Sequence, residues 1–152
     1  MPELSQQAAL RALGRPRLQS LVKAYADAVE RADAPALVSL LTEDATWAMP
    51  PLATWYRGRE AISEFLVHFG YNERWRHVPA AANGQPALGC YTYEPTLARW
   101  VPSAVAVLAV DGDLVSQVTY FLTAELLTRW GAQGTFVGRA AFPLFGLPLE
   151  LD

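Results

Sequence analysis

The hydrophobic pattern of the chain changes its period once, near residue 75. Before that point apolar residues recur every three or four positions, which is typical of helices that bury one face. After it come four runs rich in β-branched and aromatic residues, separated by turn sequences. Helices followed by a meander of strands predict an α+β fold, with helices packed on one face of a curved antiparallel sheet. Such a sheet makes a cone, whose interior is the natural place for a small-molecule cavity.

The first half of the chain predicts three amphipathic helices. Asp33 is a suitable N-cap and Pro35 suits a first helical turn, so a short second helix should follow the first and stop at Asp44. Gly70 is placed to end the third helix. Residues 1–16 are interpreted as a leader or linker, because a glycine and a proline interrupt their apolar pattern. The first and third helices are expected over 17–31 and 58–69.

The strands are predicted from their composition and from the turns between them. Residues 45–49 should form the first strand, which the Pro-Pro pair at 50–51 ends because proline donates no backbone hydrogen bond. An Asn-Gly pair at 83–84 and Asp-Gly-Asp at 111–113 predict hairpins, so the last two long strands should pair antiparallel. The pattern also allows a short helix over 123–130. The four long strands are expected over 75–82, 85–93, 100–110 and 114–122.

One domain of residues 17–125 is therefore expected, followed by an extension of residues 126–152. The extension is interrupted by glycine and proline but remains apolar, so it should pack on the domain, at the pocket mouth or against a partner subunit. The whole chain is 52% hydrophobic and contains five tryptophans, more large apolar surface than a domain of 152 residues must bury. This excess favours an apolar pocket or an oligomer interface, and a homodimer formed through the sheet is expected.

Charge and cysteine usage argue against several classes of function. A net charge of −3 and a pI near 5.4 disfavour direct nucleic-acid binding, since phosphate contacts need clustered Lys and Arg. Cys90 is the single cysteine, and one Cys with two His cannot assemble a Cys/His zinc site. No membrane-spanning run or secretory signal is visible in the sequence. A cytoplasmic protein without metal, cofactor or membrane association is expected.

Residues 44–62 deliver aromatic side chains to the turn where the first strand leaves the sheet. Aromatic and amide side chains on this turn, the third helix and the strands can hold an extended apolar molecule and orient it with a few hydrogen bonds. The expected lining consists of Trp47, Met49, Trp55, Tyr56, Phe65, Phe69, Trp75, Asn83, Gln85, Tyr91, Gln117 and Tyr120.

Residues 17–123 resemble the SnoaL-like group of the nuclear transport factor two-like superfamily. The resemblance lies in the order of elements, in Tyr25 on the first helix, in Glu-Asp-Ala-Thr at 43–46 and in Tyr-Arg-Gly-Arg-Glu-Ala-Ile at 56–62. The superfamily includes ketosteroid isomerase, limonene epoxide hydrolase and polyketide cyclases. Membership implies a cone-shaped fold with three N-terminal helices packed on a strongly curved antiparallel sheet.

A closer resemblance, spanning nearly the whole chain, is to the SnoaL-like extension at the C-terminus of some extracytoplasmic-function sigma factors. It is carried by Ser-Gln-Gln-Ala at 5–8, Met-Pro-Pro at 49–51, Trp-Tyr-Arg-Gly at 55–58, Ala-Asn-Gly-Gln-Pro-Ala at 82–87 and Phe-Gly-Leu-Pro at 145–148. The resemblance implies a regulatory domain whose partners would be sigma-factor domains or RNA polymerase. The sequence itself shows no promoter-reading domain.

The resemblance also indicates which catalytic groups this chain lacks. Tyr25 matches the tyrosine of ketosteroid isomerase, but Met49 occupies the position of its carboxylate base and Ala106 lies near that of its second acid. Tyr25 and His68 remain as candidate proton donors, because His77 is expected to lie away from the pocket beside an arginine. Two functions stay open. The first is a cyclase or isomerase for a hydrophobic, polyketide- or terpenoid-like substrate, and the second is a ligand-binding or protein-docking regulatory domain.

Overall fold

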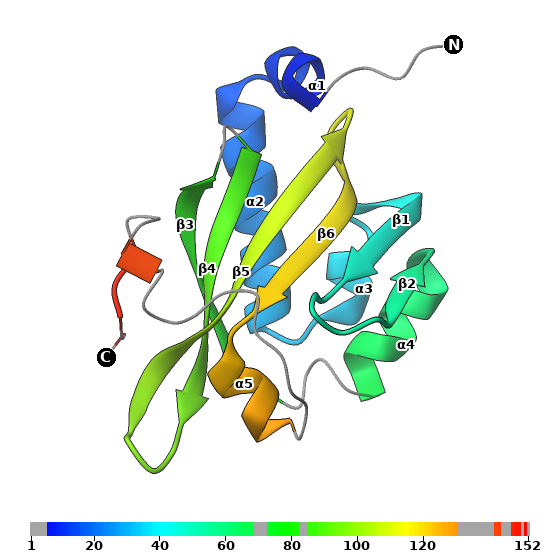
Figure 1. Cartoon of the computed structure of the whole chain (residues 1–152). Helices are drawn as coiled ribbons and strands as arrows, with labels where there is room; N and C mark the ends of the chain where they lie inside the picture. Colours follow the sequence, from blue (N-terminus) through cyan, green and yellow to red (C-terminus); the bar gives the residue numbers. More distant parts are fainter. Residues whose placement is uncertain are drawn as a thin grey trace.

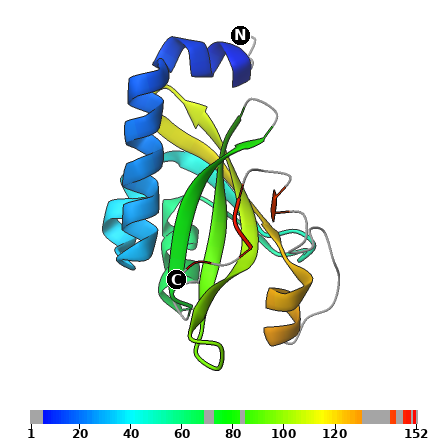
Figure 2. The same cartoon turned by 90° about the vertical axis from the view of Figure 1, so that its left-hand side faces the viewer.

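The computed structural model describes residues 6–68, 73–82, 85–130, 142–143, 147–149 and 151. The helices of this part are α1 (Gln6–Leu13), α2 (Arg15–Glu30), α3 (Ala34–Val38), α4 (Arg59–His68) and α5 (Ala124–Arg129). The strands are β1 (Leu41–Ala48), β2 (Trp55–Arg57), β3 (Trp75–Ala82), β4 (Gln85–Glu94), β5 (Arg99–Asp111) and β6 (Leu114–Leu122). The long helix α2 lies against one face of a twisted sheet, and the described C-terminal residues lie on the opposite face (Figures 1 and 2).

The six strands form one sheet in the order β2-β1-β6-β5-β4-β3. All neighbours pair antiparallel except β1 and β6, which run parallel. The expected pairing of the last two long strands is confirmed, since Asp111 pairs with Leu114 across their turn. The α+β class and the curved, mainly antiparallel sheet are likewise as the sequence predicts.

Local sequence explains where the helices begin. The carboxylate of Asp33 accepts a hydrogen bond from the backbone N–H of Ala36 at 3.1 Å and so caps α3. The hydroxyl of Thr123 accepts one from the backbone N–H of Leu126 at 3.2 Å and caps α5. Helix α2 buries Tyr25, among other apolar side chains, on the side that faces the sheet. Helices α2 and α5 begin and end within two residues of the predicted bounds.

Two predictions of local structure are wrong. The second helix was expected to continue to Asp44, but α3 stops at Val38 and the chain is already in strand β1 at Leu41. The short strand β2, where only a turn and a helix start were expected, pairs antiparallel with β1. At the start of β1, pairing with a strand distant in sequence outweighs local preference. Leu41, for example, pairs with Val115 of β6.

The region expected to be a leader contains a docked helix. Ala9 and Leu13 of α1 are buried against the core. The side-chain amide of Gln6 donates to the backbone carbonyl of Val110 at 3.2 Å and accepts from its N–H at 2.9 Å. Gly14, at φ 82°, separates α1 from α2 in a conformation that favours glycine. Residues 6–13 therefore belong to the folded unit.

The sheet carries a different cluster of buried residues on each face. The inner cluster packs under α2 and α4 and includes Tyr25, Trp47 and Tyr120. The outer cluster is small and consists of Tyr91, Val105, Phe142 and Leu147. Phe142 and Leu147 of the C-terminal extension thus pack on the outer face of the sheet, and Leu151 packs against this cluster. No helix within the described ranges is long and apolar enough to cross a membrane.

Candidate functional site

The interior of the cone contains a cavity of about 20 Å³, enough for roughly one water molecule. Aromatic side chains fill most of the space around it. The ring of Trp47 stacks on that of Tyr120 at 5.1 Å, and Trp75 meets Tyr120 edge-on at 5.9 Å. The lining includes Trp47, Met49, Phe65, Trp75, Tyr120 and Trp130, together with aliphatic side chains of α2, α4 and β6.

A chain of buried hydrogen bonds runs beside this cavity and links α2, β6 and β3. The hydroxyls of Tyr25 and Tyr120 are 2.7 Å apart, and either can donate to the other. The Tyr120 hydroxyl also lies 3.0 Å from Nε2 of His77. Tyr25 is fully buried, and Tyr120 and His77 are nearly so. Three groups able to hold or pass a proton therefore lie in contact at the centre of the fold.

Burial keeps the imidazole of His77 neutral. Desolvation lowers the pKa of His77 to about 3, since a charged ring could not be hydrated there. Its Nδ1 has no hydrogen-bond partner among the described residues, and the nearest carboxylate oxygen, on Glu30, is 4.0 Å away. That same oxygen instead accepts a hydrogen bond of 2.7 Å from the backbone N–H of His77. Glu30 thus holds the backbone of β3 in place and does not stabilise a protonated imidazole.

A second buried polar atom that lacks a partner among the described residues belongs to Trp47, a residue of the cavity wall. Nε1 of Trp47 has no hydrogen-bond partner in the described part of the chain, although the residue is only 3% exposed. Met49 lies beside it in the cavity wall, and Ala106 is buried in the inner core cluster. Met49 and Ala106, which the resemblance to ketosteroid isomerase sets at or near the positions of its acids, are both buried apolar residues. The buried polar residues among those described are His77, Thr92, Ser103 and Thr123, with no Asp or Glu.

The structure brings six predicted site residues together in the interior. Tyr56 lies at the edge of this group, partly buried, with its ring stacked on that of Phe65 at 4.6 Å. The six in the interior are Tyr25, Trp47, Met49, Phe65, Trp75 and Tyr120.

The other predicted site residues are not brought to the cavity. Trp55 is 57% exposed on the edge strand β2. Gln85 and Gln117 line a shallow hollow of the sheet together with Phe121. The side chains that alternate with them along β6, those of Val118 and Tyr120, belong to the inner cluster. Tyr91 lies in the outer cluster. Phe69 and Asn83 fall outside the described residues.

Of the two histidines, the structure places His77 and not His68 beside Tyr25. His68 is exposed in the last turn of α4. The expectation that His77 lies away from the pocket is wrong. The signal that could have placed it is strand alternation, because His77 and Trp75 are two residues apart on β3 and must share a face. A catalytic role for His68 stays a prediction.

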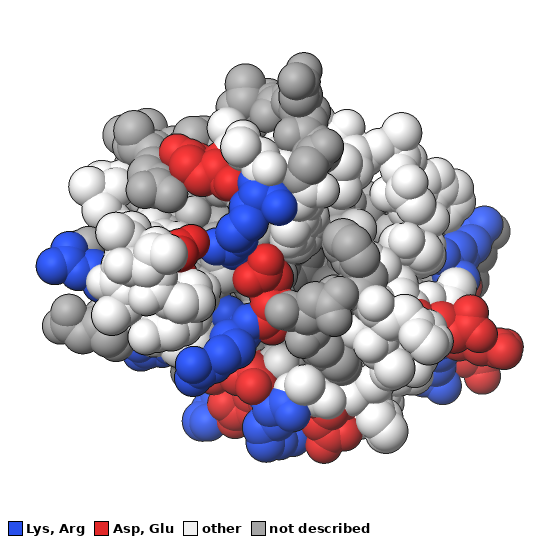
Figure 3. Space-filling view, turned by 90° about the horizontal axis from the view of Figure 1, so that it is seen from below, with Lys and Arg blue, Asp and Glu red and all other residues white. Residues whose placement is uncertain are grey.

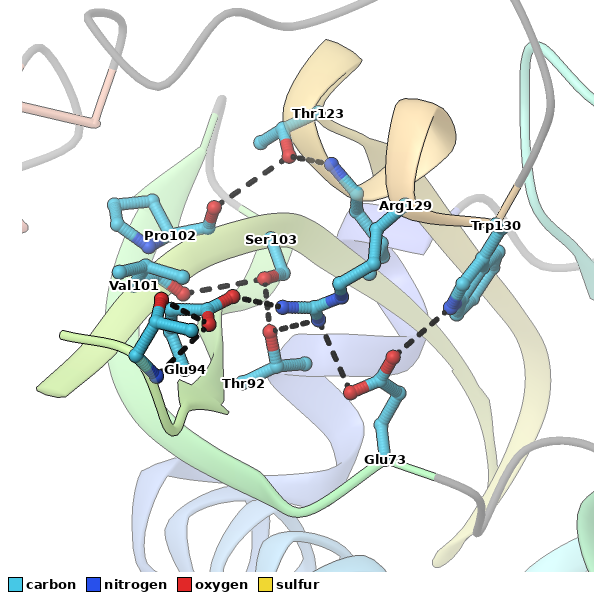
Figure 4. A network of polar contacts seen from close by, with 11 residues as sticks. Glu73, Thr92, Glu94, Val101, Pro102, Ser103, Thr123, Arg129 and Trp130 are labelled. Atoms are coloured by element: carbon cyan, nitrogen blue, oxygen red, sulfur yellow. Dashed lines mark hydrogen bonds and ion pairs between the residues drawn. The ribbon is translucent and has the colours of Figure 1, made fainter. Parts of the chain in front are cut away.

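A network of polar contacts centred on Arg129 lies beside Trp130 (Figure 4). The guanidinium of Arg129 contacts carboxylate oxygens of Glu73 at 3.0 Å and Glu94 at 3.3 Å, and donates to the hydroxyl of Thr92 at 2.6 Å. Nε1 of Trp130 donates to the other oxygen of Glu73 at 3.1 Å. Charges of both signs alternate over the end of the molecule seen in Figure 3. Among the described residues, no three His, Cys, Asp or Glu side chains form a candidate metal site.

Sequence comparison places this arrangement among known families. The family model of the SnoaL-like domain matches residues 22–118. The extracytoplasmic-function (ECF) RNA polymerase sigma factor SigG of Mycobacterium tuberculosis is 36% identical over 120 residues, which make up 76% of this chain and 32% of the sigma factor. This chain thus spans less than two thirds of the length of the curated relatives that it matches.

Solved structures share the fold at lower identity. A candidate ketosteroid isomerase from Kribbella flavida matches with a TM-score of 0.60 and 22% identity, covering 82% of this chain and 85% of that one. A candidate polyketide cyclase from Xanthomonas campestris matches with a TM-score of 0.58 and 23% identity, covering 78% and 97%. An NTF2-like protein of unknown function from Burkholderia xenovorans matches with a TM-score of 0.61 and 13% identity, covering 83% and 99%.

Proposed function

Since the chain belongs to the SnoaL-like domain family, we propose that it is a ligand-binding regulatory domain of the kind attached to ECF sigma factors. The observation that carries the proposal is the interior, which is aromatic and has no buried carboxylate among the described residues. Such an interior can hold an apolar molecule by shape. It offers little to a reaction that needs a strong base.

Acid-base catalysis favours a group whose pKa lies near the working pH. Burial instead lowers the pKa of His77 to about 3, and its Nε2 is already bonded to Tyr120. Met49 and Ala106 replace the acids that would abstract a proton or stabilise an oxyanion. These three features favour binding over turnover.

The identity to SigG supports the choice of partner. At 36% over 120 residues it extends over more of the chain than the family model does. A regulatory domain of this kind would contact the sigma-factor domains or RNA polymerase. We also propose that a homodimer, if it forms, uses the outer face of the sheet, where Gln117 is exposed.

Transcription by chimeric sigma factors tests the proposal. Three proteins are compared in vitro with RNA polymerase: SigG, SigG without its matched third, and SigG in which this chain replaces that third. The chimera is expected to restore the transcription level of SigG. As a matched control, the Burkholderia protein with the same fold is inserted at the same place and should not restore it. Equal transcription from the chimera and the truncated protein would overturn the proposal.

A cofactor-independent isomerase or cyclase for a hydrophobic substrate is the second candidate. The Tyr25–Tyr120–His77 chain favours it, because phenol donors held in a dry site can stabilise an enolate oxygen. Deuterium exchange at the carbon next to the carbonyl of 1-indanone, followed by NMR, tests this directly. An enzyme should accelerate exchange over buffer, and Tyr25→Phe should slow it. Exchange at the buffer rate would remove this candidate.

A further inference from the structure

We propose that the indole of Trp130 is a plug in the interior site, and that a neutral, flat ligand with one hydrogen-bond acceptor takes its place. The acceptor would bind Nε1 of Trp47. This inference deepens the proposed function and rests on it only in assuming that the interior binds a ligand. It concerns what enters the site and how, whereas the chimeras test what the domain regulates.

Trp130 lies between the interior cavity and the surface of the molecule. It follows directly on the short helix α5 and is the C-cap of that helix. It lines the interior cavity together with Val29 and Leu66, yet the residue remains partly exposed. The residue thus packs against the core while part of it is open to solvent. The remaining free volume of about 20 Å³ shows how completely the surrounding rings fill the site.

The polar contacts that hold the plug are partly buried, and water still reaches them. Nε1 of Trp130 donates to Glu73, whose other oxygen contacts Arg129. The Arg129 and Glu73 side chains are 31% and 18% exposed, so water competes for both partners. Ion pairs at such positions contribute about 1 kcal/mol or less. Most of the resistance to opening should therefore come from the apolar contacts of the ring, which a flat apolar ligand can replace.

The buried donor on Trp47 selects the ligand. Nε1 of Trp47 has no partner among the described residues, and an unpaired buried donor is costly. A ligand carbonyl or ether oxygen could accept from it, which a pure hydrocarbon cannot do. The aliphatic wall formed by Val29, Leu66 and Leu122 carries no charge to pair with an ionised ligand. The site therefore fits a neutral bicyclic or polycyclic ketone or ether.

Binding of 1-indanone, a flat ketone about the size of the indole, is compared with binding of the hydrocarbon indane by titration calorimetry. Trp130→Ala should bind 1-indanone about tenfold more tightly than the wild type, because no ring must be displaced. In Trp130→Ala, 1-indanone should also bind about tenfold more tightly than indane. Adding Trp47→Phe should remove most of that preference while keeping the apolar wall.

Trp55→Ala is the matched control, since it also removes a tryptophan but one that is 57% exposed. It should bind both probes as the wild type does. The Glu73→Ala variant keeps the Trp130 ring but removes its hydrogen bond. This variant should bind 1-indanone several-fold more tightly than the wild type. It replaces Trp130→Ala in the comparison if that variant fails to fold.

Two results would overturn the inference. One is that Trp130→Ala and Glu73→Ala bind 1-indanone no better than the wild type. The other is that Trp130→Ala binds 1-indanone and indane equally. Either can occur while the sigma-factor chimera still restores transcription, so failure of the plug and failure of the regulatory proposal are distinguishable.

Discussion

Tyr25 and Tyr91 are both fully buried, but they lie on opposite faces of the sheet and their hydroxyls have different partners. The Tyr25 hydroxyl bonds another side chain, Tyr120, which in turn bonds His77. The Tyr91 hydroxyl donates to the backbone carbonyl of Pro148 at 2.6 Å. Side-chain partners can change rotamer when a ligand enters, whereas a backbone partner fastens a segment in place. Two equally buried tyrosines thus have different roles. Tyr25 belongs to a side-chain network that can rearrange, and Tyr91 fastens the C-terminal extension to the sheet; we call this bond to Pro148 the clasp.

The largest expected effect lies on the inner face, where protonation of His77 should lower the stability of the fold. Its folded pKa of about 3 lies below its ordinary value of 6.5, so between these values the unfolded chain binds a proton that the folded chain does not. Stability should therefore fall as the pH drops from about 6.5 toward 3, by roughly 1.4 kcal/mol per pH unit from this group. Urea unfolding between pH 7 and 5 measures the slope.

Replacement of His77 by Gln should reduce the slope of stability against pH by about 1.4 kcal/mol per pH unit, because Gln cannot bind the proton that the unfolded chain takes up at His77. His68→Gln changes an exposed histidine and should keep the wild-type slope. Equal slopes for the wild type and His77→Gln would contradict the burial of a neutral ring at this position.

Removing the central hydroxyl of the inner network should have the next largest effect. Tyr120→Phe takes away the group to which both Tyr25 and His77 are bonded, so two buried hydrogen bonds disappear together. We expect a loss of about 2 kcal/mol in the free energy of unfolding. Tyr25→Phe removes one of these bonds and should cost about half as much. If the two variants are equally stable, the three groups do not form a connected chain.

On the outer face, a methyl group at position 89 should disturb the contact with the C-terminal extension. A Cβ on Gly89 would lie 2.6 Å from Cδ1 and 2.7 Å from Cδ2 of Leu147. We expect Gly89→Ala to displace Leu147 and cost about 1 kcal/mol. Leu147→Ala combined with Gly89→Ala should recover part of this loss relative to the sum of the single variants. Strict additivity in this double-mutant cycle would contradict the contact.

The smallest effect is expected for Tyr91→Phe, which removes a single bond to Pro148. The loss of stability should be about 0.5 kcal/mol, because Pro148 is exposed and water can replace the lost partner. Hydrogen exchange at the amides of Leu147 and Leu149 should quicken, while exchange in α2 should not. Burial raises the pKa of Tyr91 to about 12, so the clasp should withstand alkaline pH up to that region. Faster exchange in α2 would show that the two faces are coupled.

The sequence was most informative where local pattern and turn chemistry agree. The bounds of β3 and β6 match those predicted, because period-two alternation and turn residues mark both ends of these strands. The start of β1 at Leu41 depends on its pairing with Val115, far along the chain, which no local pattern contains. Distant pairing is therefore the part of the fold that the sequence alone left undetermined.

The interior aromatic residues could be predicted by type, but their faces could not. Alternation assigns Gln117 and Tyr120 to opposite faces of β6 without saying which face is inside. One extra residue on β5 between Pro102 and Ala104, and one on β6 between Val115 and Gln117, further offset the alternation along these strands. Aromatic and amide side chains were therefore assigned to one lining, although Tyr91 and Gln117 lie elsewhere.

The amide of Gln6 has a consequence for solubility. Val110 lies on β5 beyond Val107, which pairs with Ala87 near the start of β4. By bonding both the N–H and the carbonyl of Val110, the Gln6 side chain acts there as a neighbouring strand of one residue. Uncovered strand edges are templates for pairing with other chains. If α1 detached, this part of β5 would become a point at which two molecules could join edge to edge and begin to aggregate.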